Sequence, residues 1–298
     1  MRVALAAAVR TLPRGPGLAY EPKFDGHRLL ISRTPTEVVL QARSGRIVTS
    51  AFPDLEGAAR QLPPETVLDG EVVVWHAGRT DFALVQRRAA ATPARAALLA
   101  QSLPASYAAF DVLTLAGLDL RARPYERRRA LLVDLLLPLG PPIQPVPMTT
   151  DPELAATWYE TLPASGIEGL VIKRLDQPYP AGRRAWRKLR HTETRDAAVV
   201  GWTGPARRPV ALVLVLPGEE DETPVVSSPL SPALRAETAA TLAARPTGDP
   251  AGTITAIGLG EVPYHLLDPP LPAEVRHTST RHPPPEVLRL RPDLAPNH

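Results

Sequence analysis

The chain has 298 residues, a formal net charge of +3 and 44% hydrophobic residues, which suits two domains with substantial cores. The absence of cysteine excludes disulfides and any cysteine-ligated zinc site. No apolar run approaches the ~20 residues of a membrane span, and no secretory leader is recognisable, so we expect a cytoplasmic protein that makes no membrane contact.

Alternating apolar runs predict strands in the first two thirds of the chain, and patterns of helical period lie between them. The third of the expected helices begins with Pro124, which is favourable in the first turn of a helix. The expected strands cover residues 19–32, 36–42, 67–75, 106–113 and 168–173, and the expected helices cover residues 54–61, 82–90, 124–137 and 151–162.

A polar segment at residues 191–196 marks a domain boundary. Five short strand candidates follow it, interrupted by one alanine-rich helical stretch, and this pattern predicts a small barrel of the OB or SH3-like type. Prolines gather in expected loops at 217–232, 246–250 and 263–272, where they imply stiff connections. The strand candidates cover residues 197–203, 209–216, 253–259, 271–277 and 286–291, and the helix covers residues 232–245.

Lysine is scarce, because only three of the 34 basic residues are lysines. An ammonium can lose its proton in a suitable site and act as a nucleophile, whereas a guanidinium stays charged. Lys23, Lys173 and Lys188 are therefore candidates for positions at which arginine cannot replace lysine. For any one of them taken alone, chance in an arginine-biased composition is the alternative.

Lys23 lies in the pattern K-x-D-G-x-R, which ends at Arg28. Carboxylates stand two residues away on either side, at Glu21 and Asp25, and a turn-forming Asp-Gly pair follows. The pattern resembles the nucleotidyltransferase superfamily of DNA ligases, RNA ligases and mRNA capping enzymes, in which the lysine attacks the α-phosphate of a nucleotide and becomes a lysyl-NMP. For the motif alone, a surface lysine on a hairpin turn is the alternative.

Five further segments follow in the order of that superfamily, and the ordered set makes the resemblance specific. They are Q-A-R-S-G-R at 41–46, V-L-D-G-E-V-V at 67–73, Y-A-A-F-D-V-L at 107–113, E-G-L-V-I-K at 168–173 and W-R-K-L-R at 186–190. A weaker match, R-L-R-P-D, covers residues 289–293. The family pattern commonly has lysine where Arg190 stands and a lysine where Leu294 stands.

The resemblance implies a role for particular residues of these segments. It makes Lys23 the nucleophile that carries AMP, and it leaves the role of Lys173 open, with a solvent-facing strand residue as the alternative. The other implied roles are adenine recognition by the side chain or backbone of Glu21, nucleotide binding by Arg28, nick-phosphate binding by Arg43, ribose and metal contact by Glu71, base stacking by Phe110, metal binding by Glu168, α-phosphate binding by Lys188 and Arg190, and pyrophosphate orientation by Arg289, Arg291 and Asp293.

The chemistry explains why such residue types are needed. A free lysine amine has a pKa near ~10.4, so the site must lower it by desolvation or nearby positive charge. Glu71 and Glu168 are hard oxygen ligands that suit Mg²⁺ or Mn²⁺ bound together with substrate phosphate.

The spacing along the expected strands supports a shared site for one pair of residues and conflicts with it for another pair. Lys188 and Arg190 are two residues apart, so on a strand they share a face. Glu168 and Lys173 are five apart and would fall on opposite faces of an ideal strand. Either a bulge intervenes, or Lys173 has a different role.

We therefore expect a minimal, two-domain, bacterial-type ATP-dependent DNA ligase. The resemblance implies an α+β adenylation domain with antiparallel sheets over residues 1–193 and a small all-β OB-fold barrel over residues 194–298. It also implies ATP as cofactor, nicked duplex DNA as substrate, a monomeric state, a role in DNA repair and recombination, and Ku or repair polymerases as partners. The alternatives are an RNA ligase, a capping-type guanylyltransferase, or a catalytically silent nucleic-acid-binding module.

Overall fold

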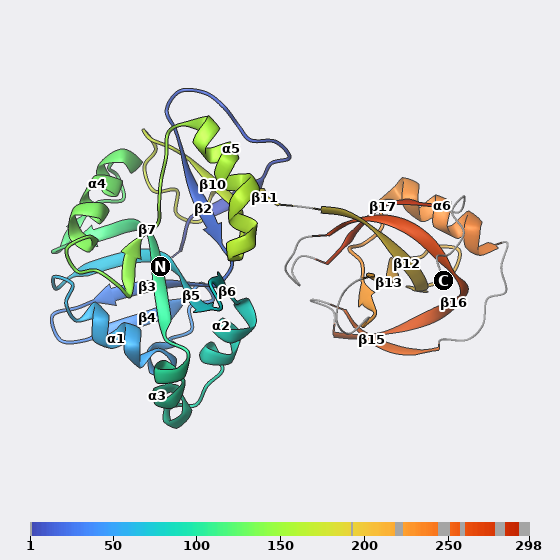
Figure 1. The fold of residues 1–298 in the computed structure, drawn as a ribbon, viewed down its shortest axis with the longest axis horizontal. Coiled ribbons are helices and arrows are strands. Elements are labelled where there is room, and N and C mark those ends of the chain that lie inside the picture. Colours follow the sequence, from blue (N-terminus) through green and yellow to red (C-terminus); the bar gives the residue numbers. More distant parts are fainter. Residues whose placement is uncertain are drawn as a thin grey trace. The chain divides into compact units, whose positions relative to one another are not determined.

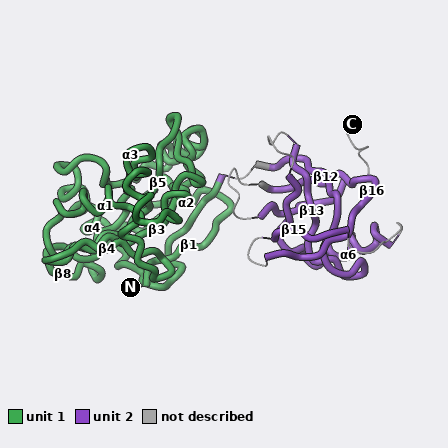
Figure 2. The backbone as a smooth tube through the Cα atoms, turned by 90° about the horizontal axis from the view of Figure 1, so that it is seen from below, with its two compact units in different colours: residues 1–190 green, residues 191–298 purple. Residues whose placement is uncertain are grey.

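The computed structural model divides the chain into two compact units, residues 1–190 and residues 191–298 (Figure 2). It describes residues 2–191, 193–217, 223–243, 251–256, 260–277 and 284–291, without the side chains of residues 193 and 277. Among these residues, no helix has the length and apolar character that a membrane crossing requires.

The larger sheet of the first unit has the strand order β4-β3-β5-β7-β8, with β6 beside β5 and β9 beside β7 (Figure 1). Its described pairings are antiparallel apart from the parallel pair β7 and β9. The strands are β3 (His27–Arg33), β4 (Val38–Ala42), β5 (Thr66–His76), β6 (Arg79–Thr80), β7 (Ala105–Leu115), β8 (Leu118–Asp119) and β9 (Ile143–Pro145).

The smaller sheet has the strand order β1-β11-β10-β2. It joins segments that lie far apart in the chain, because β2 pairs antiparallel with β10, and β11 lies between β10 and β1. The pairing of β1 with β11 is parallel. The strands are β1 (Leu5–Ala8), β2 (Leu18–Phe24), β10 (Ile167–Arg174) and β11 (Arg184–Arg190).

Helices cover the outer face of each sheet. Three helices share one hydrophobic core with the larger sheet, and α5 packs on β2 and β10 of the smaller sheet. The side chains of Asp81 and Asp151 cap α2 and α5 by accepting hydrogen bonds from backbone N–H groups, as capping aspartates commonly do. The helices are α1 (Pro53–Ala59), α2 (Phe82–Ala89), α3 (Pro93–Ser102), α4 (Tyr125–Leu136) and α5 (Pro152–Thr161), with 3-10 turns at Thr49–Ala51 and Leu162–Ser165.

Because side chains alternate along a strand, each one lies either in the outer core, which is the hydrophobic core shared by the larger sheet and its helices, or in the space between the two sheets. On β3, Leu29 and Ile31 belong to the outer core, whereas Leu30 belongs to a second cluster with Tyr179 and Trp186. That second cluster includes residues from both sheets. The inner faces of the two sheets therefore meet, and the alternation of side chains along each strand places polar side chains of β2, β5 and β11 in that space.

In its described residues, the second unit consists of one antiparallel sheet and a single helix. The strand order is β14-β13-β12-β16-β15, and β17 pairs with β16. Leu234 and Leu242 of the helix pack with Trp202 in the core of this unit. The elements are β12 (Glu193–Thr203), β13 (Ala211–Val215), β14 (Val225–Val226), α6 (Pro232–Ala243), β15 (Gly252–Ala256), β16 (Gly260–His277) and β17 (Glu286–Leu290).

The predicted proline-rich loop at residues 263–272 is wrong, because these residues lie within β16. Pro269 and Pro270 lie in an irregularity of the strand: Leu266 pairs with Gly201 and Leu271 pairs with Val199, so the residues between them bulge out of the ladder. Bulges are among the few places where a sheet tolerates proline. The helix α3 and the short strands β1, β6, β8, β9 and β14 had no counterpart among the expected elements.

Candidate active site

A bulge in β10 brings Glu168 to Lys23. Across the pairing of β10 with β2, Ile167 faces Phe24 and the next pair is Leu170 with Pro22. Two residues of β10 therefore oppose the single residue Lys23, which is the arrangement of a β-bulge. The Nζ atom of Lys23 donates a hydrogen bond to Oε1 of Glu168, whose side chain is buried.

Gly169 makes this bulge possible. Its φ of +147° is a conformation that side chains rarely adopt, and an added Cβ would overlap the carbonyl oxygen of Leu189. Only glycine meets both demands. The bulge explains how Glu168 and Lys173 can share one face although they are five residues apart, because the extra residue lets both side chains reach the space between the sheets. There, Glu168 contacts Lys23, and Lys173 contacts Glu21.

Cations from β11 surround the same carboxylate. The Nε atom of Arg190 lies 3.3 Å from Oε2 of Glu168. Burial, together with the charges of Arg190 and Lys23, lowers the pKa of Lys188. Oε2 of Glu168 is buried and has no hydrogen bond within the part of the chain that the structure describes. This oxygen is therefore suited to a further electropositive partner.

Glu71 contributes a second carboxylate from β5. Burial raises its pKa to about 7; the charges of Lys23 and Arg28 act in the opposite direction, and those of Asp25 and Glu168 add to the increase. These charges act on one another, so the five groups form one electrostatic cluster. Near neutral pH, Glu71 is poised between its neutral and its ionised form.

Arg28 is held in place by side chains of both sheets and of the segment between β10 and β11. Its guanidinium forms a bidentate ion pair with the buried Asp69, with distances of 3.0 Å from Nε to Oδ1 and 2.6 Å from Nη2 to Oδ2. The hydroxyl of Tyr179 donates to the same carboxylate at 2.5 Å. The guanidinium carbon lies 5.1 Å from the ring centroid of Phe110 and 5.4 Å from that of Trp186. Arg28 is thus fixed beside the aromatic ring that stacks on the base in the family pattern.

Glu21 and Lys173 lie together in this space. Nζ of Lys173 is 2.7 Å from Oε2 of Glu21, and both side chains are almost fully buried. The same ammonium donates to the carbonyl oxygen of Phe110 at 2.9 Å. The alternative of a solvent-facing lysine at this position is therefore wrong. A buried ion pair of this kind is strongly destabilised when one partner is removed.

These side chains line a cavity of about 100 Å³. Its lining includes the candidate nucleophile, the candidate base-stacking ring and charged groups from β2, β3, β5 and β10, so it has the chemistry that a nucleotide requires. The lining residues are Ala6, Glu21, Pro22, Lys23, Phe24, Arg28, Glu71, Phe110, Val171, Lys173 and Trp186.

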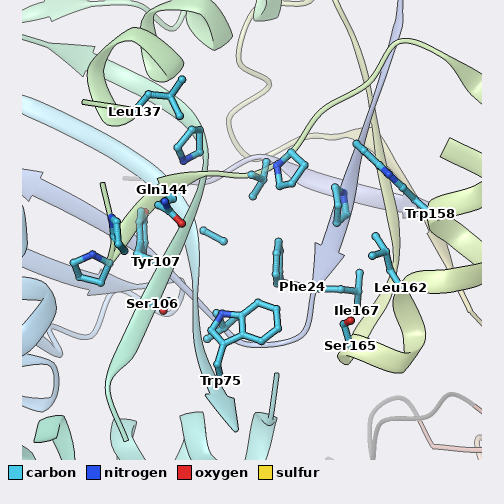
Figure 3. A pocket seen from close by; sticks show the side chains of 18 residues that line it. Phe24, Trp75, Ser106, Tyr107, Leu137, Gln144, Trp158, Leu162, Ser165 and Ile167 are labelled. Atoms are coloured by element: carbon cyan, nitrogen blue, oxygen red, sulfur yellow. The ribbon is translucent and has the colours of Figure 1, made fainter. Parts of the chain in front are cut away.

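A larger cavity of about 460 Å³ adjoins the first, because Pro22 and Phe24 line both. Phe24, Trp75, Tyr107 and Trp158 stand around it (Figure 3). No residue with a formal charge is found among the described residues that line it. A triphosphate would have no cation to bind there, so the smaller, charged cavity is the better candidate for the nucleotide.

Glu71 and Glu168 are suited to hold a divalent metal. No group of three or more histidine, cysteine or acidic side chains that could hold a metal occurs in the described ranges. Glu71 and Glu168 nevertheless supply two carboxylates that influence one another, and Oε2 of Glu168 lacks a hydrogen bond there. Mg²⁺ is commonly bound by one or two carboxylates plus water and substrate phosphate, so the donor set suits that ion.

The remaining expected site residues lie elsewhere. Arg43 is exposed in the turn that follows β4, one position beyond the pair of Leu29 with Ala42. In the second unit, Arg289 and Arg291 both pair with Glu274, at 2.5 Å and 3.7 Å. Asp293 falls outside the described residues.

Sequence reasoning missed four side chains that support the site. Trp186 shares a strand face with Lys188, and Asp69 shares one with Glu71, so the spacing of two could have indicated both. Tyr125 and Tyr179 had no such indication, because they come from α4 and from the segment between β10 and β11.

The raised pKa of Glu71 predicts a pH-dependent stability. The folded pKa of about 7 exceeds the ordinary value of 4.5, so the folded protein binds an extra proton between these values and loses stability as pH rises through them. Glu71→Gln, measured by chemical denaturation in metal-free buffer, should gain free energy of unfolding relative to the unaltered protein as pH increases from about 5 to about 7. A stability difference that stays constant across this range would show that Glu71 does not titrate there.

A family model described as "ATP dependent DNA ligase domain" matches residues 4–190. DNA ligase C2 of Mycolicibacterium smegmatis is 38% identical over 199 residues, which cover 66% of this chain and 56% of the relative. DNA ligase C of Mycobacterium tuberculosis is 36% identical over 203 residues, with the same two coverages. The chain thus spans a little more than half the length of these curated relatives.

Solved structures extend the similarity over the whole chain. A mycobacterial DNA ligase D complexed with ATP and MES is 26% identical, with a TM-score of 0.55, and covers 99% of this chain and 96% of its own. A Lig E DNA ligase has a TM-score of 0.63 at 17% identity, covering 98% and 100% of the two chains, which indicates a shared fold. The expected mixed fold of helices and antiparallel sheets is confirmed as that of the nucleotidyltransferase domains in such proteins.

Proposed function

Since the chain belongs to the ATP-dependent DNA ligase family, we propose that it seals nicks in duplex DNA with Lys23 as the covalent nucleophile. The observation that carries this proposal is the bulge that holds Lys23 against Glu168, beside the cations of β11. The surrounding charges suit a reaction in which a neutral amine attacks a phosphate that gains negative charge.

Three transfers make up the proposed reaction. First, the Lys23 amine attacks the α-phosphorus of ATP, the bond to pyrophosphate breaks, and the amine loses its proton. Second, the 5′-phosphate at the nick attacks the adenylate phosphorus and releases Lys23. Third, the 3′-hydroxyl attacks the activated 5′-phosphate, the phosphodiester bond forms, and AMP leaves.

Residues that line the charged cavity and two cations of β11 divide this work. Phe110 stacks on the adenine and Glu21 contacts its amino group, while Arg28 and Glu71 hold the ribose. Lys188 and Arg190, on one face of β11, neutralise the α-phosphate. These assignments are supported by the shared cavity and by the ion pairs around Glu168.

Glu71 and Glu168 would hold Mg²⁺ or Mn²⁺ in this reaction. Such an ion would compensate charge on the substrate phosphates. Oε2 of Glu168, which lies 3.3 Å from Arg190 but has no hydrogen bond among the described residues, supports this assignment. A bound cation would stabilise the ionised form of Glu71, whose pKa burial raises.

We further propose an adenylation domain over residues 1–193 and an OB-fold domain over residues 194–298. The single antiparallel sheet with one helix between its strands supports this, as does the similarity to ligase D over the whole chain. Binding of DNA by the barrel and the catalytic face should weaken steeply with salt. Arg43 would bind the nick phosphate, and Arg289, Arg291 and Asp293 would orient the pyrophosphate.

Labelled nucleotides test the proposed function. Incubation with α-labelled ATP and divalent metal should leave label on the denatured chain, whereas α-labelled GTP should not. Addition of a nicked DNA duplex should then remove the label and yield a sealed strand. Labelling by GTP alone would indicate a guanylyltransferase, and sealing only of nicks flanked by RNA would indicate an RNA ligase.

Lys188→Arg should be tolerated better than any change of Lys23. The substitution keeps a cation on the face it shares with Arg190, and a guanidinium also neutralises phosphate. We expect the rate of adenylation in a single-turnover assay to fall by about tenfold or less, compared with about 10²-fold for Lys188→Ala. An arginine variant as impaired as the alanine variant would mean that Lys188 does more than supply charge.

A further inference from the structure

We propose that Lys173 is a positioning residue that selects adenine by holding Glu21 and Phe110 in place at the edge and face of the base. This inference rests on the proposed function, since it assumes that a nucleotide occupies the charged cavity. It assigns a task to the one lysine for which the family pattern implied none.

Lys173 lies in a cage of aromatic rings. Its ammonium nitrogen is 4.3 Å from the ring centroid of Trp186, 4.7 Å from that of Tyr125 and 5.0 Å from that of Phe110. The side chain is 1% exposed. A compact ammonium suits such a cage through cation–π attraction, and a broader guanidinium would have to displace the rings. This explains why lysine persists here in an arginine-rich chain.

The ammonium joins β7 of the larger sheet to β2 and β10, which pair with each other in the smaller sheet. Lys173 is on β10; it pairs with Glu21 of β2 at 2.7 Å and donates to the carbonyl oxygen of Phe110 on β7 at 2.9 Å. From α4, the hydroxyl of Tyr125 donates to the other carboxylate oxygen, Oε1 of Glu21. Lys173 therefore fixes the acidic residue of one sheet relative to the stacking ring of the other.

This network has a consequence for base selection. A carboxylate has about four acceptor positions, and Lys173 and Tyr125 each occupy one, so Glu21 keeps free lone pairs in the cavity. The 6-amino group of adenine can donate to them, whereas the 6-oxo group of guanine would place an acceptor against an acceptor. Sites built to hydrogen-bond one group discriminate strongly against an analogue that lacks it.

A nucleotide lacking the 6-amino group provides a sharp test. The comparison uses ATP and purine riboside triphosphate in single-turnover adenylation. The unaltered protein should require about tenfold more purine riboside triphosphate than ATP for half-saturation, as expected for loss of one such hydrogen bond. Lys173→Met should need about tenfold more ATP for half-saturation than the unaltered protein, and its maximal rate should stay within about threefold of that of the unaltered protein. Its preference for ATP over purine riboside triphosphate should fall below about threefold.

Two further variants complete the design. Arg174→Met alters the next residue on β10, which is exposed and pairs with Asp176, and it should behave as the unaltered protein. Should Lys173→Met fail to fold because Glu21 is left unpaired, the double variant Lys173→Met with Glu21→Gln removes both charges. It should fold and should show the same loss of preference.

The outcomes separate the two proposals. If the unaltered protein forms no adenylate with ATP, the proposed function fails. If it does, and a folded Lys173→Met or double variant keeps the tenfold preference for ATP, the role of Lys173 in base selection is overturned. A fall in maximal rate with an unchanged preference also overturns it, because that result would indicate a role in phosphate chemistry instead.

Discussion

Lys23→Arg is expected to abolish the covalent adenylate while leaving the fold intact. The substitution keeps a positive charge opposite Glu168, but the guanidinium does not deprotonate at accessible pH and is a poor nucleophile. Loss of an essential nucleophile lowers activity by several orders of magnitude, so we expect a fall of at least about 10⁴-fold, to the detection limit of an α-labelled ATP assay.

The same variant should remain stable. The side chain of Lys23 is 20% exposed, so a longer cation can extend toward solvent, as arginine and lysine commonly do. The midpoint of thermal unfolding should stay within about 3 °C of that of the unaltered protein. Retention of a covalent adduct by a folded Lys23→Arg would show that another residue is the nucleophile.

Glu168→Gln should have the second largest effect on adenylation. The carboxylate accepts from Lys23, lies 3.3 Å from Arg190 and has a buried oxygen without a hydrogen bond in the described residues. Gln keeps the shape but loses the charge that orients both cations and would bind a metal. Removal of one preorganised electrostatic group costs about 10²-fold to 10³-fold in rate, and we expect a single-turnover decrease in that range.

A magnesium titration identifies the reason for this decrease. If Glu168 holds the metal, the variant should need about tenfold or more Mg²⁺ for half-maximal rate. Glu153→Gln is the matched control, because Glu153 is an exposed carboxylate that pairs with Arg14, and exposed ion pairs contribute little. A Glu168→Gln variant with unaltered rate and metal dependence would contradict the proposed role.

The sequence allowed much of the site to be predicted because its residues occur in short strands. A spacing of two places Lys188 and Arg190, or Glu21 and Lys23, on one face whatever the surrounding structure. The long strands that carry the site and most helices were likewise predicted from periodicity, and the structure confirms them, whereas the short strands β1, β6, β8, β9 and β14 were missed. The alanine-rich α3 was missed because its buried face consists chiefly of Ala96 and Leu99, which is a weak helical pattern.

Other features depend on contacts that no local pattern records. The bulge at Gly169 needs both a positive φ and the proximity of the Leu189 carbonyl, so the relation of Glu168 to Lys173 stayed open at the level of spacing. The surroundings of Lys173 come from three separate strands and a helix. The prolines of β16 indicated a loop, because the bulge opposite β12 that accommodates Pro269 and Pro270 cannot be recognised from the sequence.

The scarcity of lysine acquires a physical explanation at each position. Lys23 is placed where the proposed reaction needs a nucleophilic amine, and Lys173 lies in an aromatic cage that fits an ammonium. Lys188 is half-buried, and this burial, together with the neighbouring cations, lowers its pKa; a neighbouring position on its strand face is already arginine. We therefore expect tolerance of arginine to increase from Lys23 and Lys173 to Lys188.

The central claim is that Lys23 carries AMP between ATP and nicked DNA, and intact-mass spectrometry tests it most directly. After incubation with ATP and Mg²⁺, the chain should gain the mass of one AMP, peptide mapping should locate it at Lys23, and a nicked duplex should discharge it with formation of a sealed strand. An unmodified chain, or an adduct on any other residue, would contradict this account.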